Sequence, residues 1–156
     1  MEKFLENLNR ISYNLYKINH ILNITFPLIK NKNLLLNILI GIKKSVVDSI
    51  NLILQYEYLY RNIDIHSDFN LNFKIFITQC SPKYQISNKE IQLIEELFEI
   101  VRQQKSSSMN ILNGTKIVIL SENMQKTDLE YEKLREFLEL GKILLERTKS
   151  QFLRKI

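Results

Sequence analysis

The chain offers few side chains that could perform acid–base chemistry. Its 156 residues include two histidines, His20 and His66, and one cysteine, Cys80. His66 has a polar neighbourhood, because it closes the segment Tyr-Leu-Tyr-Arg-Asn-Ile-Asp-Ile-His that also contains Arg61 and Asn62. An arginine can stabilise the negative charge of a phosphate, and a histidine can give or take a proton near neutral pH. Arg61 and His66 are therefore candidate catalytic residues, and the polar Asn62 follows the arginine directly.

The geometry of this candidate group depends on whether the helix predicted before it continues through it. In a continuing helix, Arg61 and His66 would fall within about 140° of each other, and both could reach one cleft. Ile63 and Ile65 alternate with polar residues, however, as in an extended segment. A histidine that follows a helix can also be structural, because its cationic form interacts favourably with the C-terminal end of the helix dipole. The sequence leaves both interpretations of His66 open.

The spacing Arg-x4-His, with a polar residue after the arginine, resembles the R-x4–6-H signature of the HEPN superfamily (higher eukaryotes and prokaryotes nucleotide-binding). Its members are small all-α bundles that commonly dimerise, and many are ribonucleases that need no metal. The resemblance implies a cleft between two protomers that binds RNA and needs no cofactor. In that cleft Arg61 would stabilise phosphate charge, His66 would act as general acid or base, and Asn62 would orient them.

Other classes of catalytic site lack their residue patterns. Three scattered glycines provide no phosphate-binding loop, which excludes nucleotide hydrolysis by a P-loop. One cysteine allows neither an intrachain disulfide nor a thiolate cluster, and the two histidines lie on different predicted elements. Glutamates on two predicted helices, within residues 90–99 and 132–139, are expected to be solvated. We therefore expect no metal site.

Basic residues exceed acidic ones and give a formal net charge of +5, which favours an acidic partner such as RNA. The basic residues most clearly outnumber the acidic ones at the end of the last predicted helix. These cations can equally complement the C-terminal dipole of that helix and keep the surface soluble. The candidate nucleic-acid-binding residues are Lys142, Arg147, Lys149, Arg154 and Lys155.

Apolar residues at spacings of three and four predict five helices. Pro27 should end the first helix at residues 23–25, and the second, from about residue 35 to 60, should be long and central because its apolar stripe is broad. A shorter third helix is expected over residues 69–80. Capping boxes predict that the fourth helix starts at Ser87, with Glu90, and that the fifth opens at Thr127, with Glu130.

A small β-hairpin is predicted at about residues 109–120, between the fourth and fifth helices. Asn113 and Gly114 suit a type I′ turn, because both residues tolerate positive φ, and β-branched residues follow them. Two strands alone are marginally stable in water, so the hairpin must pack on the helices or pair with another chain.

The sequence therefore predicts an all-α, single-domain bundle over residues 1–156 with a hairpin before the last helix. The N-terminal residues lack a secretory pattern, and the apolar run of residues 34–42 is too short to span a membrane, so we expect a cytoplasmic protein. Three functions stay open. One is a HEPN-like homodimer that binds or cleaves RNA without metal, and another is a non-catalytic module that docks a partner protein through the second helix or the hairpin edge. The third is a helical nucleic-acid binder that uses the basic end of the last helix.

Overall fold

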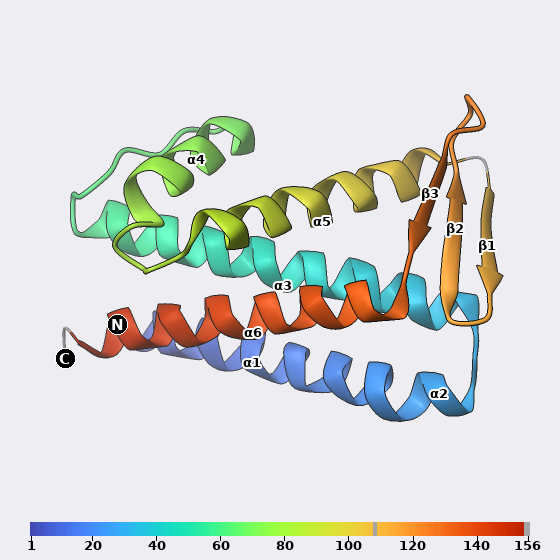
Figure 1. Cartoon of the computed structure of the whole chain (residues 1–156). Coiled ribbons are helices and arrows are strands. Elements are labelled where there is room, and N and C mark those ends of the chain that lie inside the picture. The colour runs from blue at the N-terminus through green and yellow to red at the C-terminus, as the bar shows by residue number, and fades with distance from the viewer. Residues whose placement is uncertain (108, 155–156) are drawn as a thin grey trace.

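The chain folds mainly into helices, with a small three-stranded antiparallel sheet at one end (Figure 1). The computed structural model describes residues 1–107 and 109–154. Two of the five helical stretches contain a π-helical segment. In chain order the helical elements are α1 (Glu2–His20), η1 (Ile21–Thr25), α2 (Phe26–Leu28), α3 (Lys32–Leu59), α4 (Phe69–Ile75), η2 (Phe76–Cys80), α5 (Asn88–Ser106) and α6 (Tyr131–Leu153).

Helix α3 forms the centre of the bundle, as its broad apolar stripe predicts. It contacts α1, α6, α5 and η2 (Figure 1), and its apolar residues from Leu35 to Tyr56 supply much of the core. Glycines on α3 and α6 allow both helices to approach α1 closely. A Cβ added at Gly41 would lie 2.9 Å from Ile18 Cδ1, and one at Gly141 would lie 3.1 Å from Leu15 Cδ2. Within the described residues, no helix is both long and apolar enough to cross a bilayer.

The predicted end of the first helix before Pro27 is wrong. The chain continues from α1 through the π-helical segment η1 into α2, and Pro27 lies in the first turn of α2. Proline lacks the N–H that a helix interior needs, and its ring clashes with the carbonyl of the preceding turn. The wider π turn at Ile21–Thr25 changes the register of the preceding carbonyls and so accommodates the ring.

The predicted hairpin is present and is extended by a third strand. Strands β1 (Met109–Asn113), β2 (Lys116–Leu120) and β3 (Lys126–Leu129) pair in that order. Asn113 pairs with Lys116, so the turn residues are Gly114 and Thr115, one position later than predicted. Positive φ occurs at Gly114 (65°) and not at Thr115, which fits a type II′ turn. The sheet packs on the helices through Ile117, Ile119 and Leu129, which are buried.

Of the two predicted capping boxes, one is confirmed and one is wrong. Ser87 and Glu90 exchange both hydrogen bonds at the start of α5. Thr127 does not open a helix, because residues 126–129 pair with β2 as strand β3 and α6 starts only at Tyr131. The Thr127 hydroxyl instead donates to Gln103 Oε1 at 2.8 Å. Backbone pairing in the sheet therefore overrides the local capping preference.

Candidate functional site

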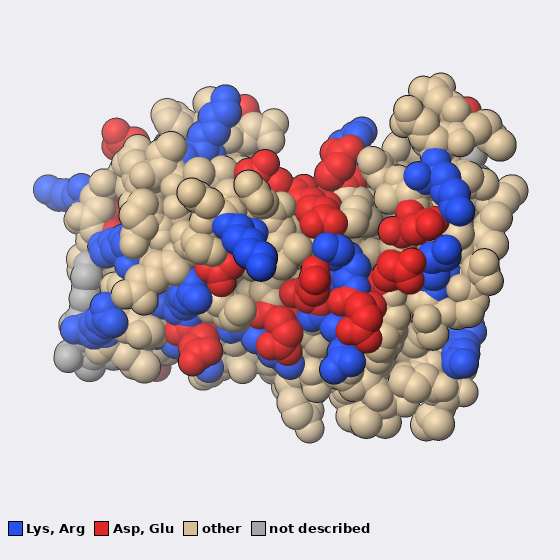
Figure 2. Space-filling view, viewed as in Figure 1, with Lys and Arg blue, Asp and Glu red and all other residues tan. Residues whose placement is uncertain are grey.

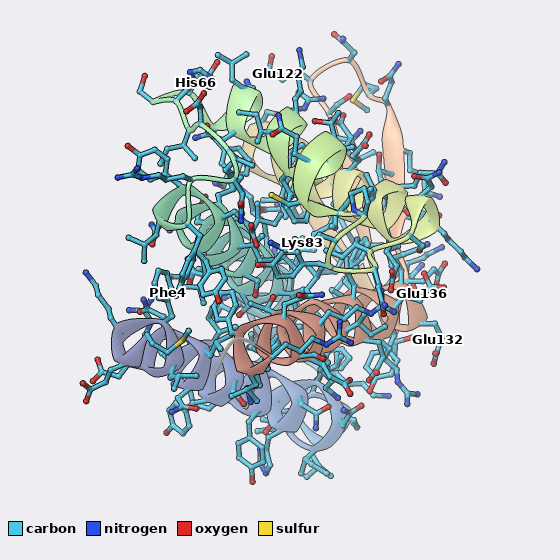
Figure 3. The ribbon with its side chains drawn as sticks, turned by 90° about the vertical axis from the view of Figure 1, so that its left-hand side faces the viewer. Phe4, His66, Lys83, Glu122, Glu132 and Glu136 are labelled. Atoms are coloured by element: carbon cyan, nitrogen blue, oxygen red, sulfur yellow. The ribbon has the colours of Figure 1, made fainter. Side chains whose placement is uncertain are left out.

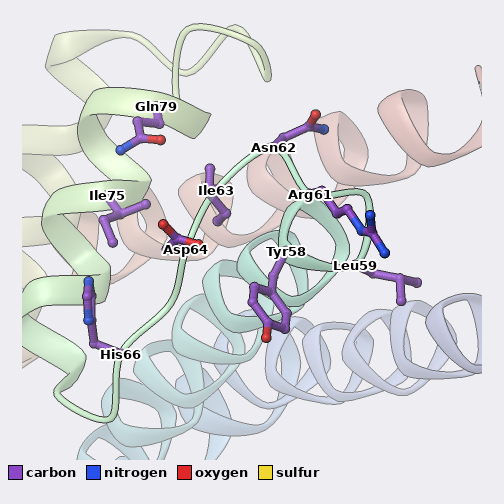
Figure 4. Close-up of a pocket in the computed structure, with 9 residues that line it drawn as sticks. All are labelled: Tyr58, Leu59, Arg61, Asn62, Ile63, Asp64, His66, Ile75 and Gln79. Atoms are coloured by element: carbon purple, nitrogen blue, oxygen red, sulfur yellow. The ribbon is translucent and has the colours of Figure 1, made fainter.

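An open cleft of about 780 Å³ lies beside the loop that joins α3 to α4 (Figure 4). All three candidate catalytic residues border it, together with residues from the end of α3 and from α4 and η2. The cleft is lined by Tyr58, Leu59, Arg61, Asn62, Ile63, Asp64, His66, Ile75 and Gln79.

Helix α3 ends in a Schellman motif, which fixes where the loop begins. The N–H of Arg61 donates to Tyr58 O and that of Asn62 to Glu57 O, each at 2.9 Å. Arg61 has φ 60°, the left-handed conformation that this motif requires and that glycine adopts most readily. The segment from Asn62 to His66 is therefore not helical, and the helical alignment of Arg61 with His66 does not exist.

Arg61 and His66 share the cleft but do not face each other. The Arg61 side chain projects to one side of the loop, whereas His66 lies beside α4 on the other side (Figure 4). His66 is also away from the C-terminal end of α3 (Figure 4), so it does not cap that helix. Both side chains are exposed, and among the described residues Arg61 forms no ion pair. Within this chain, the site is thus an open surface with two separate functional groups.

The backbone of His66 is held by the side-chain amide of Asn72, on α4. The His66 N–H donates to Asn72 Oδ1, and Asn72 Nδ2 donates back to His66 O, both at 2.7 Å. This bracket fixes the histidine backbone while its side chain remains exposed at the edge of the molecule (Figure 3). Sequence reasoning missed Asn72, because an asparagine six residues after a histidine is no recognised motif.

Asn62 is tied to a buried carboxylate instead of to Arg61 or His66. Its Nδ2 donates to Glu57 Oε2 at 2.7 Å, and the Glu57 side chain is 2% exposed. Lys83 Nζ donates to the same oxygen at 2.8 Å, and the Tyr84 hydroxyl donates to Oε1 at 2.8 Å. Lys83 lies among the helix ends, away from the outer loop that carries His66 (Figure 3). Asn62 therefore anchors the start of the loop.

The ionisation of Glu57 follows from these contacts. Burial acts to raise the pKa of Glu57, but hydrogen bonds from Lys83, Asn62 and Tyr84 outweigh burial and lower the pKa. Burial, followed by the hydrogen bond to Glu57, raises the pKa of Tyr84. Glu57 was not predicted as part of the site, although a signal existed. It follows Leu54 by three residues and Ile53 by four, and thus lies on the buried stripe of α3.

The predicted basic residues of the last helix do not form one patch. Lys142 Nζ donates to Asn19 Oδ1 at 2.8 Å and pairs with Glu139 at 3.1 Å. Arg147 donates to Gln85 O and to Glu90 Oε1, and so ties α6 to the start of α5. Lys149 borders a groove between α1 and α6, Arg154 is exposed after α6, and Lys155 lies outside the described residues.

Acidic and basic side chains alternate over the surface formed by α5 and α6 (Figure 2). Lys133 pairs there with Glu96 at 3.3 Å and with Glu136 at 2.9 Å. The glutamates expected at the surface of these two helices are exposed, except Glu90, which is half-buried and pairs with Arg147. Among the described residues, no group of three or more His, Cys, Asp or Glu is placed to hold a metal ion.

Comparisons of the chain with protein-family models, with curated proteins and with solved structures find no match. The geometry of the cleft is therefore the basis for any functional conclusion.

Proposed function

We propose that this chain is a HEPN-like helical protein that binds RNA at the α3–α4 cleft and cleaves it without a metal. The observation that carries the proposal is that the unpaired Arg61 guanidinium and the exposed His66 border one open cleft. A free guanidinium can form bidentate hydrogen bonds to a phosphate. The adjoining Tyr58 side chain, whose residue is 51% exposed, can stack on a base.

The proposed reaction is transfer of the phosphoryl group to the adjacent ribose oxygen. The 2′-hydroxyl loses its proton and attacks phosphorus, the bond to the 5′-oxygen breaks, and that oxygen gains a proton. The products are a 2′,3′-cyclic phosphate and a 5′-hydroxyl. His66 would accept the first proton or supply the second, and Arg61 would stabilise the charge on the phosphoryl oxygens.

The separation of the two side chains within one protomer supports a homodimer as the active form. In such a dimer, Arg61 of one protomer would approach His66 of the partner subunit. The end of α3 exposes three consecutive large side chains beside the cleft: Tyr58, Leu59 (59% exposed) and Tyr60 (45% exposed). Clustered apolar surface of this kind is typical of a contact site between proteins.

RNA binding is tested by fluorescence anisotropy of a labelled single-stranded RNA at several salt concentrations with a chelator present. We expect Arg61→Ala to weaken binding by about fivefold to tenfold and to lower the salt dependence, since one phosphate contact is lost. Arg10→Ala is the control, because it removes the same charge from α1. Equal affinity for the wild type and Arg61→Ala, or no binding by the wild type, would refute RNA binding at this cleft.

A further inference from the structure

Strand β1 leaves one side of its backbone unpaired with β2. It forms the edge of the sheet, because the strand order is β1-β2-β3. Asn113 and Lys116 flank a two-residue turn and so form a hydrogen-bonded pair, and such pairs alternate along an antiparallel ladder. Asn110 and Leu112 therefore turn their backbone N–H and C=O groups outward. This outer side of residues 109–113 is the β1 edge.

A contact from α3 supports the outward direction of the Asn110 carbonyl. Lys32 Nζ, at the start of α3, donates to Asn110 O at 3.1 Å. Within the described part of the chain, the N–H of Asn110 and both backbone groups of Leu112 have no hydrogen-bond partner. Three groups at the β1 edge are thus available to a further strand.

The outer face of the sheet beside this edge is apolar. Met109 is 53% exposed and Ile111 is 43% exposed, and both project from the same face because they are two residues apart. Their cross-strand neighbours Leu120 and Val118 are half-buried. β1 itself contains no charged residue and no proline, which are the usual features that keep an edge strand from pairing.

The charges near the edge are positive. Lys32 contacts Asn110 and Lys116 pairs with Asn113, and the segments around them, residues 26–37 and 105–121, contain no acidic residue. Lys116 pairs with Asp128 at 3.4 Å, whereas Lys32 contacts only a backbone carbonyl among the described groups. If two β1 edges paired with each other, both copies of Lys32 would lie at the same interface, and their like charges would oppose self-association. An acidic strand would meet complementary charge.

We propose that the β1 edge binds an extended acidic segment of a partner protein as a fourth strand. Backbone hydrogen bonds to Asn110 and Leu112 would supply affinity, as in other cases of strand addition. Apolar residues at alternate positions of the segment would continue the face formed by Met109 and Ile111, and its carboxylates would pair with Lys32. This interaction surface lies at the opposite end of the bundle from the α3–α4 cleft (Figure 1) and is independent of RNA binding.

Two labelled octapeptides test the proposal, one alternating valine with glutamate and the other alternating valine with lysine. Binding is measured by fluorescence anisotropy and by NMR of the 15N-labelled full chain. We expect the glutamate peptide to bind and to shift the amide signals of Asn110 and Leu112. Ile111→Glu and Lys32→Glu should each weaken binding at least about tenfold, because each places like charges together.

Lys44→Glu is the matched control, since Lys44 lies on the same helix with its side chain 68% exposed and should leave the affinity unchanged. Both test substitutions should preserve the fold, because Ile111 is exposed and an acidic residue suits the first turn of α3. The proposal is overturned if neither peptide binds, if both bind equally, or if Ile111→Glu has no effect. It is also overturned if the wild type dimerises in sedimentation and Ile111→Glu makes it monomeric, because a second copy would then occupy the edge.

Discussion

The side-chain amide of Asn62 donates a 2.7 Å hydrogen bond to Glu57 Oε2, and this bond joins the start of the candidate loop to the buried end of α3. The Glu57 C=O also accepts the backbone N–H of Asn62 at 2.9 Å. Glu57 thus holds Asn62, the first residue of the loop, through both its side chain and its backbone carbonyl. Because Lys83 and Tyr84 hold the same carboxylate, the loop is coupled to the turn that precedes α5.

Glu57→Gln should lower the free energy of unfolding by about 1–3 kcal/mol, because it removes the charge that Lys83, Asn62 and Tyr84 share. Urea unfolding followed by circular dichroism measures this loss. Glu139→Gln is the control, since the Glu139 side chain is 64% exposed and its substitution should cost less than about 0.5 kcal/mol. Equal effects of the two substitutions would show that the Glu57 network does not stabilise the fold.

The lowered pKa of Glu57 predicts a loss of stability in acid. Its unfolded pKa is about 4.3, and a lower folded pKa means that the unfolded chain binds a proton first as the pH falls. The stabilisation is therefore complete above about pH 5 and disappears as the pH falls through the folded pKa. Unfolding free energies between pH 2.5 and 6 should show a shallower acid slope for Glu57→Gln than for the wild type. The same acid slope for both proteins would contradict a lowered pKa of Glu57 in the folded chain.

Arg61→Gly should stabilise the protein while weakening RNA binding. The φ of 60° costs a side-chain-bearing residue roughly 1 kcal/mol, and glycine avoids this cost. We expect a gain of about 0.5–1 kcal/mol in urea unfolding. Gln85→Gly is a control of the same kind, because Gln85 has φ 56° and ends a similar turn away from the cleft. It should give a similar gain in stability without a change in RNA affinity.

The basic residues of α6 should contribute unequally to RNA binding. Arg154 is exposed, and it follows Phe152, whose ring stacks on Tyr56 of α3 at 4.0 Å; this places Arg154 at the same end of the bundle as Arg61. We expect Arg154→Ala to reduce the salt slope of RNA binding by about one. Lys142→Ala should leave the slope unchanged, because Lys142 already pairs with Glu139. A larger effect of Lys142→Ala than of Arg154→Ala would instead place the RNA in the groove between α1 and α6.

The sequence predicted those parts of the fold that depend on local pattern. Apolar spacing located the long α3, and the Ser87 capping box located the start of α5, because both signals lie within a few residues. Thr127 has an equally good capping pattern but forms a strand, because β2 pairs with it. The prediction that Pro27 ends the first helix was wrong because a π turn accommodates the proline, and no local sequence pattern indicates such a turn.

For the candidate site, the sequence identified Arg61, Asn62 and His66 but not their arrangement. The break of α3 depends on an arginine adopting φ 60°, which residue type does not favour. The role of Asn62 depends on Glu57 and Lys83, which are 26 residues apart and meet only in the folded chain. Long-range contacts of this kind have no signature in a single sequence.

RNA cleavage in the presence of a chelator tests the central claim most directly. A single-stranded RNA labelled at its 5′ end is incubated with the wild type, Arg61→Ala, His66→Ala and the control His20→Ala, and the products are analysed for a 2′,3′-cyclic phosphate. We predict cleavage by the wild type and by His20→Ala, and a loss of at least about a hundredfold in rate for His66→Ala and Arg61→Ala. Equal cleavage by all four proteins, or none by the wild type, would contradict a catalytic role for this cleft.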